Sequence, residues 1–201
     1  YVVTWYDQSG EQNDATQGTS GSQPQIYNGT AVITENGKPA LSVNDDQLSA
    51  SFTLGYQVTH FGVYSTSGGA NRYAYYVDGY SNFDRNCLQT GVTVTNTEGL
   101  RFFNGSTNNY IHTSQAGDVQ QLLGYVNNGS NSALFQNDNT TTGTMNANTM
   151  GGVTIANAGN LTGYGITGTV QEAIFWETDF DATNRAGIKT DIDTYYSIPN
   201  F

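Results

Sequence analysis

The chain has 201 residues, of which 11% are charged, and its net charge is −11. A field of that sign repels phosphate groups, so the composition argues against nucleic acid and anionic membrane surfaces as partners. No apolar run is long enough to cross a bilayer, so we expect no membrane insertion. The single cysteine, Cys87, excludes an intramolecular disulfide.

Short stretches of β-branched and aromatic residues recur along the chain, which predicts an all-β protein. We expect strands near residues 1–6, 25–34, 40–43, 48–53, 57–66, 72–78, 99–103, 108–113, 118–126, 131–136, 152–156 and 164–177. Between them lie dipeptides that tolerate the positive φ of tight turns, namely Asn28-Gly29, Asn36-Gly37, Asp78-Gly79, Asn104-Gly105 and Asn128-Gly129. This spacing predicts two packed antiparallel sheets.

Two segments depart from the strand pattern. Residues 7–24 contain almost nothing apolar and are expected to form a long loop. Residues 181–197 predict a helix that begins at Asp181 as N-cap and covers one face or edge of the sandwich. Its expected core-facing stripe consists of Arg185, Ile188, Ile192 and Tyr195.

The domain organisation follows from the length and from the start of the chain. A sandwich of this size forms one unit, so residues 1–201 are predicted to be a single domain. The chain opens at once on the strand-like segment 1–6, so we expect it to be excised from a larger protein.

Three segments together carry a family resemblance. They are Val3-Thr-Trp-Tyr-Asp-Gln-Ser-Gly10 with the loop behind it, Asn36-Gly-Lys-Pro-Ala-Leu41, and Gly168-Thr-Val-Gln-Glu-Ala-Ile-Phe175 running into the helix. In this order the chain resembles the laminin-G-like members of the concanavalin A-like lectin and glucanase superfamily. Bacterial and phage adhesive proteins use such modules, and arabinofuranosidase B sandwiches open similarly. The resemblance implies a two-sheet antiparallel jelly-roll sandwich that takes ligands on its concave face or in loops along one rim. It leaves the function open.

A glycosidase activity is weighed first. Arabinofuranosidase-like enzymes carry a vicinal cysteine pair closely followed by a nucleophilic Glu. The comparable stretch here, Phe83–Leu88, has one cysteine and no Glu until Glu98. The E-x-D-x-x-E-like acids of related glucanases are absent as well. Glu172 could be a catalytic acid, but its place on an apolar strand favours a buried ion pair with Arg185.

The other reactive side chains favour structural roles. His60 and His112 lie in apolar strands outside any serine-nucleophile frame, and Cys87 has no C-x-x-C partner. We therefore predict satisfied histidines, a small buried cysteine and no catalytic residue. Trp5, Trp176 and the helix stripe are predicted to be core.

Metal binding has two calcium candidates and no zinc pattern. Asn44-Asp45-Asp46 could offer several oxygens, although the family's usual turn before an inward Leu48 is the favoured explanation. The acidic residues Asp7, Glu11 and Asp14 are a weaker candidate. We predict no metal ligand and no cofactor, with calcium as the alternative.

The richest binding candidate is the segment 72–85. Aromatic faces stack on sugar rings, while Arg and Asp bind hydroxyls, which is the chemistry that a glycan site needs. The alternative is that the rings fill the core. The predicted ligand-binding residues are Arg72, Tyr73, Tyr75, Tyr80, Phe83, Asp84 and Arg85.

These observations predict a non-catalytic recognition or adhesion module of a secreted, cell-surface or virion protein, with a glycan as the leading partner. A structural or assembly domain of a fibre or surface protein is the second hypothesis. A glycoside hydrolase whose acids do not form a recognisable pattern is the third.

Overall fold

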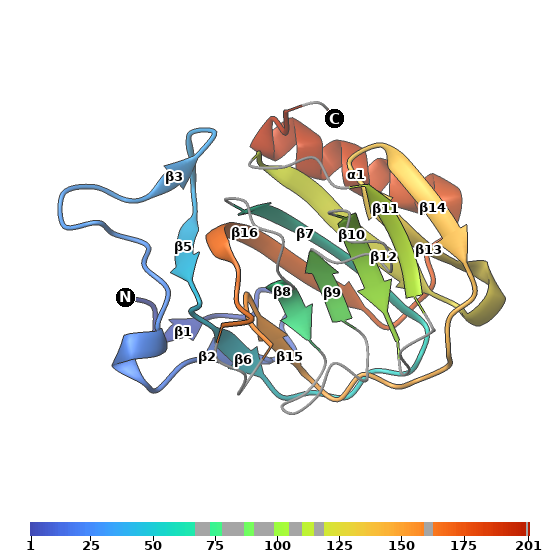
Figure 1. The fold of residues 1–201 in the computed structure, drawn as a ribbon, viewed down its shortest axis with the longest axis horizontal. Coiled ribbons are helices and arrows are strands. Elements are labelled where there is room, and N and C mark those ends of the chain that lie inside the picture. Colours follow the sequence, from blue (N-terminus) through green and yellow to red (C-terminus); the bar gives the residue numbers. More distant parts are fainter. Residues whose placement is uncertain are drawn as a thin grey trace.

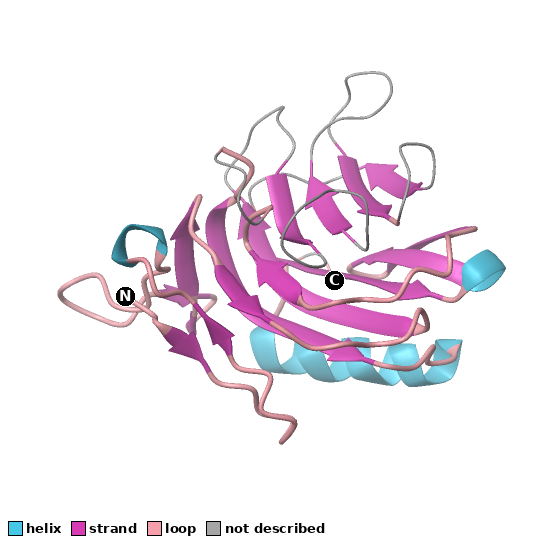
Figure 2. Cartoon of the chain, turned by 90° about the horizontal axis from the view of Figure 1, so that it is seen from below, coloured by secondary structure: helices cyan, strands magenta, loops and turns pink. Residues whose placement is uncertain are grey.

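The computed structural model describes residues 1–66, 73–77, 87–90, 99–104, 110–114, 119–158, 163–199 and 201. Two large antiparallel sheets and a C-terminal helix account for most of this part of the chain (Figures 1 and 2). The all-β, two-sheet jelly-roll sandwich that the sequence predicts is therefore confirmed.

One sheet has eight strands, most of them short. In spatial order they are β1 (Thr4–Trp5), β2 (Ala15–Thr16), β6 (Leu48–Ala50), β15 (Val153–Ile155), β8 (Tyr73–Val77), β9 (Cys87–Thr90), β10 (Gly99–Phe103) and β11 (Tyr110–Ser114).

The second sheet has six strands. Its order is β14 (Asn139–Gly143), β13 (Ser132–Gln136), β12 (Gln121–Asn127), β7 (Val58–Thr66), β16 (Thr167–Trp176) and β5 (Leu41–Asn44). A small separate pair joins β3 (Thr34–Glu35) to β4 (Lys38–Pro39), and two 3₁₀ turns cover Ser20–Ser22 and Gly129–Asn131.

Alternation along the six-stranded sheet supplies two apolar clusters, because both of its faces are covered. Its inner face packs on the eight-stranded sheet through buried side chains such as Leu123 and Tyr125, with Phe102 opposite. Its outer face carries Phe61 and its apolar neighbours under the helix. The sandwich core and the helix-facing cluster are thus separated by one layer of backbone.

Helix α1 (Ala182–Tyr196) lies along the outer face of the six-stranded sheet (Figure 2). It begins at the predicted N-cap, because the Asp181 carboxylate accepts a hydrogen bond from the Asn184 N–H at 2.8 Å. It ends at Ser197, which is in the left-handed region with φ 54°. The stripe is partly different from the predicted one: Ile192 is buried, but Tyr195 is 55% exposed and Tyr196 is buried instead.

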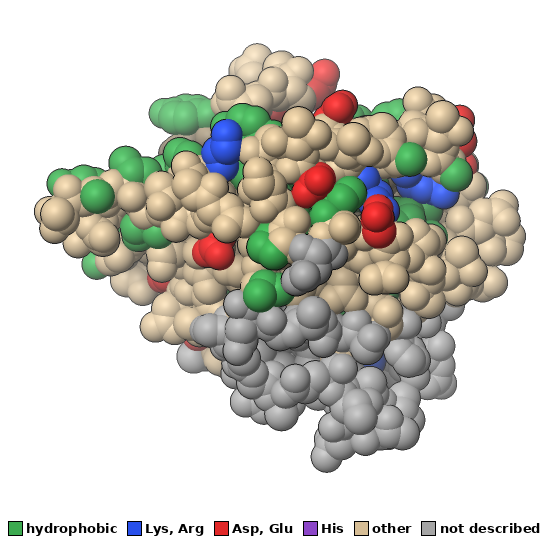
Figure 3. Space-filling view, turned by 90° about the horizontal axis from the view of Figure 1, so that it is seen from above, with side chains coloured by type: hydrophobic (Ala, Val, Ile, Leu, Met, Phe, Trp, Pro, Cys, Tyr) green, Lys and Arg blue, Asp and Glu red, His purple; other side chains and the backbone are tan. Residues whose placement is uncertain are grey.

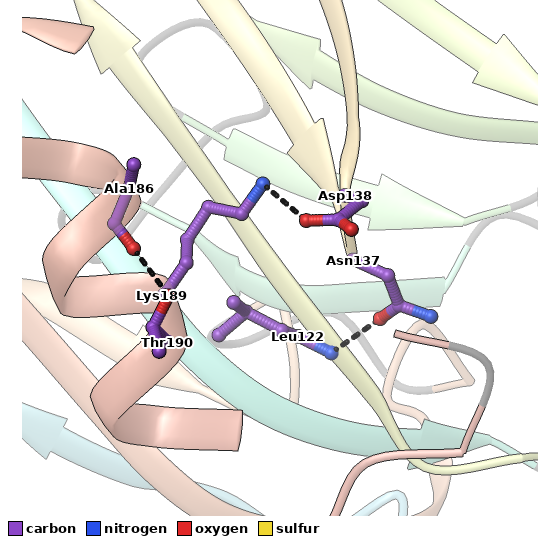
Figure 4. A network of polar contacts seen from close by, with 6 residues as sticks. All are labelled: Leu122, Asn137, Asp138, Ala186, Lys189 and Thr190. Atoms are coloured by element: carbon purple, nitrogen blue, oxygen red, sulfur yellow. Dashed lines mark hydrogen bonds and ion pairs between the residues drawn. The ribbon is translucent and has the colours of Figure 1, made fainter. Parts of the chain in front are cut away.

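A lysine tethers this helix to the β13–β14 turn (Figure 4). Lys189 runs its apolar stem along the sheet and brings its ammonium to 3.5 Å from the Asp138 carboxylate. The turn itself is held on β12, because the Leu122 N–H donates to the Asn137 side-chain oxygen at 2.9 Å. The contact joins the middle of α1 to the sheet beneath it.

The predicted continuous strand over 25–34 is wrong. The turn at Asn28-Gly29 divides it, since the Asn28 side-chain oxygen accepts from the Thr30 and Ala31 N–H groups and Gly29 has φ +95°. This segment and β3 form an arm that projects from the body (Figure 1). The arm exposes Ile26, Tyr27 and Val32, and apolar side chains gather at the left end of Figure 3.

Candidate functional site

A pocket of about 430 Å³ lies at the edge of the six-stranded sheet. The edge strand β5 pairs with β16 only from Thr167 to Val170. Past Val170 no strand in the described ranges pairs with the outer side of β16, and the space between the sheets is reached from there. We call this space the edge pocket. Its lining residues are Trp5, Tyr6, Asp7, Gln8, Ser9, Asn13, Ala15, Ala50, Phe52, Leu54, Val153, Ile155, Glu172, Ala173, Ile174, Phe175 and Trp176.

The floor of the edge pocket is apolar and belongs to the sandwich core. The eight-stranded sheet contributes Ala15, Ala50 and Val153, and β16 contributes Ala173. Alanines therefore face the pocket from both sheets. Since an alanine side chain ends at Cβ, these positions leave the space that larger core residues fill elsewhere.

Aromatic rings form the walls. Trp5 and Phe52 pack partly buried on the sandwich core, while Tyr6 is 67% exposed at the mouth. The Phe52 and Phe175 ring centroids are 6.3 Å apart. Trp5 is thus more than the core residue that the sequence predicts, because it also lines the pocket.

His60 supports the Phe175 ring from inside the sandwich. The two rings stack with centroids 4.3 Å apart, and the His60 Nδ1 is 2.9 Å from the Ile174 carbonyl oxygen. Burial lowers the pKa of His60 to about 3, so the imidazole is neutral at ordinary pH. The predicted satisfied histidine is confirmed, and its place behind a pocket ring could not be read from the sequence.

The polar side of the pocket is a loop held in one shape by Asp7. Its carboxylate accepts hydrogen bonds from the Ser9 N–H at 2.8 Å, the Asn13 N–H at 2.9 Å and the Ser9 hydroxyl at 2.8 Å. These donors, the Ser9 N–H foremost, lower the pKa of Asp7. The first part of the predicted loop, residues 7–13, is therefore organised around one side chain.

The predicted ion pair between Glu172 and Arg185 is wrong. The Glu172 carboxylate accepts from the Tyr196 hydroxyl at 2.9 Å, and the Arg185 guanidinium donates to the Phe180 carbonyl. Glu172 lies beside the last turn of α1, whereas Arg185 is eleven residues earlier, about 16 Å along the axis. Burial raises the pKa of Glu172, and the Tyr196 hydrogen bond opposes that rise.

A bulge explains which side of β16 each residue faces. The pairing with β7 shifts between Val170 and Glu172, so the residue between them, Gln171, interrupts the alternation. Val170 therefore packs in the sandwich core, whereas Ile174 and Trp176 pack in the helix-facing cluster on the opposite face. Glu172 borders the edge pocket, while its carboxylate is held by the helix on the other face.

Several aspartates of the two calcium candidates have their oxygens engaged by the chain. Asp45 accepts from the Gly163 N–H at 2.9 Å, the Gly165 N–H at 2.8 Å and the Asn157 side-chain amide at 3.0 Å. It therefore fixes the loop before β16. Asp14 accepts from the Asp7 N–H at 2.8 Å. Among the residues that the structure describes, no group of three or more acidic, His or Cys side chains could hold a metal.

The predicted aromatic binding segment stays a prediction. Tyr73 and Tyr75 lie in β8, near the middle of the eight-stranded sheet. The other predicted ligand-binding residues lie outside the described residues: Arg72, Tyr80, Phe83, Asp84 and Arg85. Cys87 is fully buried, which confirms the predicted small buried cysteine, and burial raises the pKa of its thiol to about 12.

Comparison with known proteins shows the fold and nothing narrower. No family model matches the chain, and no curated protein matches it. Among solved structures, a heptameric SAP-like pentraxin from Limulus polyphemus superposes with a TM-score of 0.53 at 16% identity, covering 78% of each chain. A structure of NanB with Optactamide reaches 0.47 at 10% identity, covering 74% of this chain and 27% of that one. The match to the pentraxin shows that the chain has a jelly-roll sandwich fold. Within the described ranges no helix has the length and apolarity needed to span a bilayer.

Proposed function

We propose that this chain is a non-catalytic recognition module that binds carbohydrate in the edge pocket. The observation that carries the proposal is the combination, in one opening, of ring faces and a rigid polar loop. Trp5, Tyr6 and Phe175 supply rings of the kind that stack on sugar C–H faces. Gln8 and Asn13 supply amides that can bind hydroxyls. The volume of about 430 Å³ falls in the usual range of small-ligand sites.

The preorganised loop supports binding with useful affinity. Asp7 holds its segment through three hydrogen bonds before any ligand arrives, so less conformational entropy is lost on binding. The pocket also weighs against the purely structural alternative, because a domain that only builds a fibre or surface layer needs no ligand-sized cleft. Placement in the laminin-G-like group, an adhesive role and a location outside the cell or on a virion belong to the same proposal. The segment 72–85 remains a second proposed surface.

A glycan array, followed by titration of the best sugars with and without calcium, tests the proposal. Tyr6→Ala should weaken binding at least fivefold, since Tyr6 stands exposed at the mouth. Tyr27→Ala, which removes a tyrosine that is 51% exposed on the arm, is the matched control and should bind as the wild type does. If no sugar binds, or if both variants bind equally well, the edge pocket is not a carbohydrate site.

Hydrolysis is the second candidate because the edge pocket borders two carboxyl residues with opposite pKa shifts. The pKa of Asp7 is lowered and that of Glu172 is raised, which is the division between base and acid that glycosidases use. Against it, the Glu172 carboxylate is bound to Tyr196 of the helix and both Asp7 oxygens accept loop donors. Turnover of an aryl glycoside that Glu172→Gln abolishes, with the melting temperature retained, would favour the hydrolase.

A further inference from the structure

We propose that the edge pocket selects neutral sugars that carry an acetamido group, with the acetyl methyl directed to the pocket floor. This inference rests on the proposed function and names the ligand class of the same site. It is based on three features: the apolar floor of the pocket, the open edge of β16 beside it and the negative charge of the surroundings.

The floor accepts a methyl group and rejects a hydroxyl. Ala15, Val153 and Ile155 are at most 6% exposed, and Ala50 and Ala173 complete the surface. A hydroxyl placed against these side chains would leave water without gaining a partner. A methyl group placed there buries apolar surface on both sides and loses no hydrogen bond.

The edge of β16 suits an amide. Past Val170 this strand has no outer strand partner in the part of the chain that the structure describes. An edge strand presents backbone N–H and C=O groups at the spacing of a peptide. Two carbonyls of this stretch already meet side chains, because the Gln171 carbonyl accepts from the Tyr196 hydroxyl and the Ile174 carbonyl lies against the His60 ring nitrogen. An acetamido group is itself one peptide unit with a methyl end, so its amide can lie along this edge while its methyl enters the floor. A 6-deoxy sugar offers the methyl alone.

Charge favours a neutral ligand. The whole chain carries −11, and Asp7 lies at the pocket with its pKa lowered, so it is ionised at neutral pH. A second carboxylate on the ligand would be repelled. Neutral N-acetylhexosamines therefore fit better than acidic N-acetylated sugars.

The test measures methyl glycosides in matched pairs by calorimetry and saturation-transfer NMR. N-acetylglucosamine against glucose, and N-acetylgalactosamine against galactose, differ only in the acetamido group. The acetamido member should bind at least tenfold tighter, with the strongest saturation on the acetyl methyl. D-Fucose (6-deoxy-D-galactose) against D-galactose measures what a methyl group alone gains, and the two affinities should differ by less than threefold. A sialoside should bind at least tenfold less tightly than N-acetylglucosamine.

Filling the floor supplies the variant arm. Ala173→Leu should weaken binding of methyl N-acetylglucosaminide at least tenfold, and Ala50→Leu does the same from the opposite sheet if the first variant does not fold. Ala186→Leu, on the exposed side of α1, is the matched control and should bind like the wild type. Circular dichroism and melting curves check that each protein is folded.

The outcomes separate the two proposals. If matched pairs bind within twofold of each other, or a folded Ala173→Leu variant binds unchanged, the acetamido inference fails and the carbohydrate function stands. If a sialoside binds as tightly as N-acetylglucosamine, the negative charge of the pocket does not exclude acidic sugars, and the neutral-ligand inference is overturned. If no member of any pair binds, the proposed function itself fails.

Discussion

The two faces of β16 meet very different surroundings. On one face Ile174 and Trp176 pack with Phe61 under a helix that covers them. On the other face Ala173 and Phe175 pack against the sandwich core and line the edge pocket. The covered face contributes to stability, and the open face leaves room for a ligand.

The difference arises from the size and coverage of the residues more than from their polarity. Both faces are apolar, but α1 supplies Ile192 and Tyr196 to close the outer one. The inner face ends in alanines, and β5 stops pairing with β16 at Val170. Adjacent residues of one strand can thus serve core packing and a binding surface, because successive side chains point in opposite directions.

Removing a ring from the covered face should have the largest effect. Phe61 is fully buried, so Phe61→Ala is expected to lower the free energy of unfolding by about 3–5 kcal/mol. Tyr6→Ala, at the open pocket, should change it by less than about 0.5 kcal/mol. Urea denaturation of both variants measures the contrast. A loss below 1 kcal/mol for Phe61→Ala would mean that the helix face is not a packed core.

Acid should destabilise the protein through His60, on the inner face. Its pKa is about 3 when folded and 6.5 in its ordinary state, so the unfolded chain takes up the proton first. Stability from the neutral imidazole is full above pH 6.5 and is lost as pH falls, by about 2 kcal/mol between pH 7 and 5. Urea midpoints across this range should show the slope in the wild type and a flatter one in His60→Gln. Equal slopes would contradict a buried neutral His60.

Removing one hydroxyl should have a smaller effect on the covered face. The Tyr196 hydroxyl donates to the Glu172 carboxylate at 2.9 Å and approaches the Gln171 carbonyl at 3.2 Å. Tyr196→Phe is expected to cost about 1–2 kcal/mol, since a partly buried carboxylate loses a donor. Thermal melts measure the loss, and Tyr195→Phe, on the exposed neighbour, should melt as the wild type does.

The sequence predicted elements well where pattern and length agreed. The strands near 99–103 and 57–66 and the helix from Asp181 follow directly from periodicity and capping. The sequence did not predict the short strands β2, β4, β9 and β14, because two to five residues with few apolar positions carry little periodicity.

The site was harder to predict because it depends on distances between segments. Trp5, Ala50 and Ala173 come together only when the two sheets pack. No local sequence pattern predicts that the edge strand β5 stops pairing with β16 at Val170. The Glu172–Arg185 expectation failed for a similar reason. The ion pair required a β16 strand without a bulge. It also required the first turns of the helix to lie beside Glu172, where the structure places Tyr196, eleven residues after Arg185.

Glu172→Gln should have the smallest effect and the opposite pH dependence to that of His60. Burial raises the folded pKa of Glu172 above its ordinary value of 4.5, so the folded state favours the protonated carboxyl. The stability that this proton provides is present below pH 4.5 and is lost as pH rises through the higher folded pKa. A glutamine keeps an oxygen for the Tyr196 hydroxyl and avoids the cost of a partly buried charge.

At pH 7 the free energy of unfolding of the variant should therefore lie within about 0.5 kcal/mol of that of the wild type or be slightly higher. Breaking a buried ion pair would instead lower it by about 3–5 kcal/mol. At pH 4 the free energy of unfolding of the wild type should rise relative to that of the variant. Urea titrations at both pH values decide between the two, and a loss of several kcal/mol at pH 7 would show that Glu172 has a cationic partner after all.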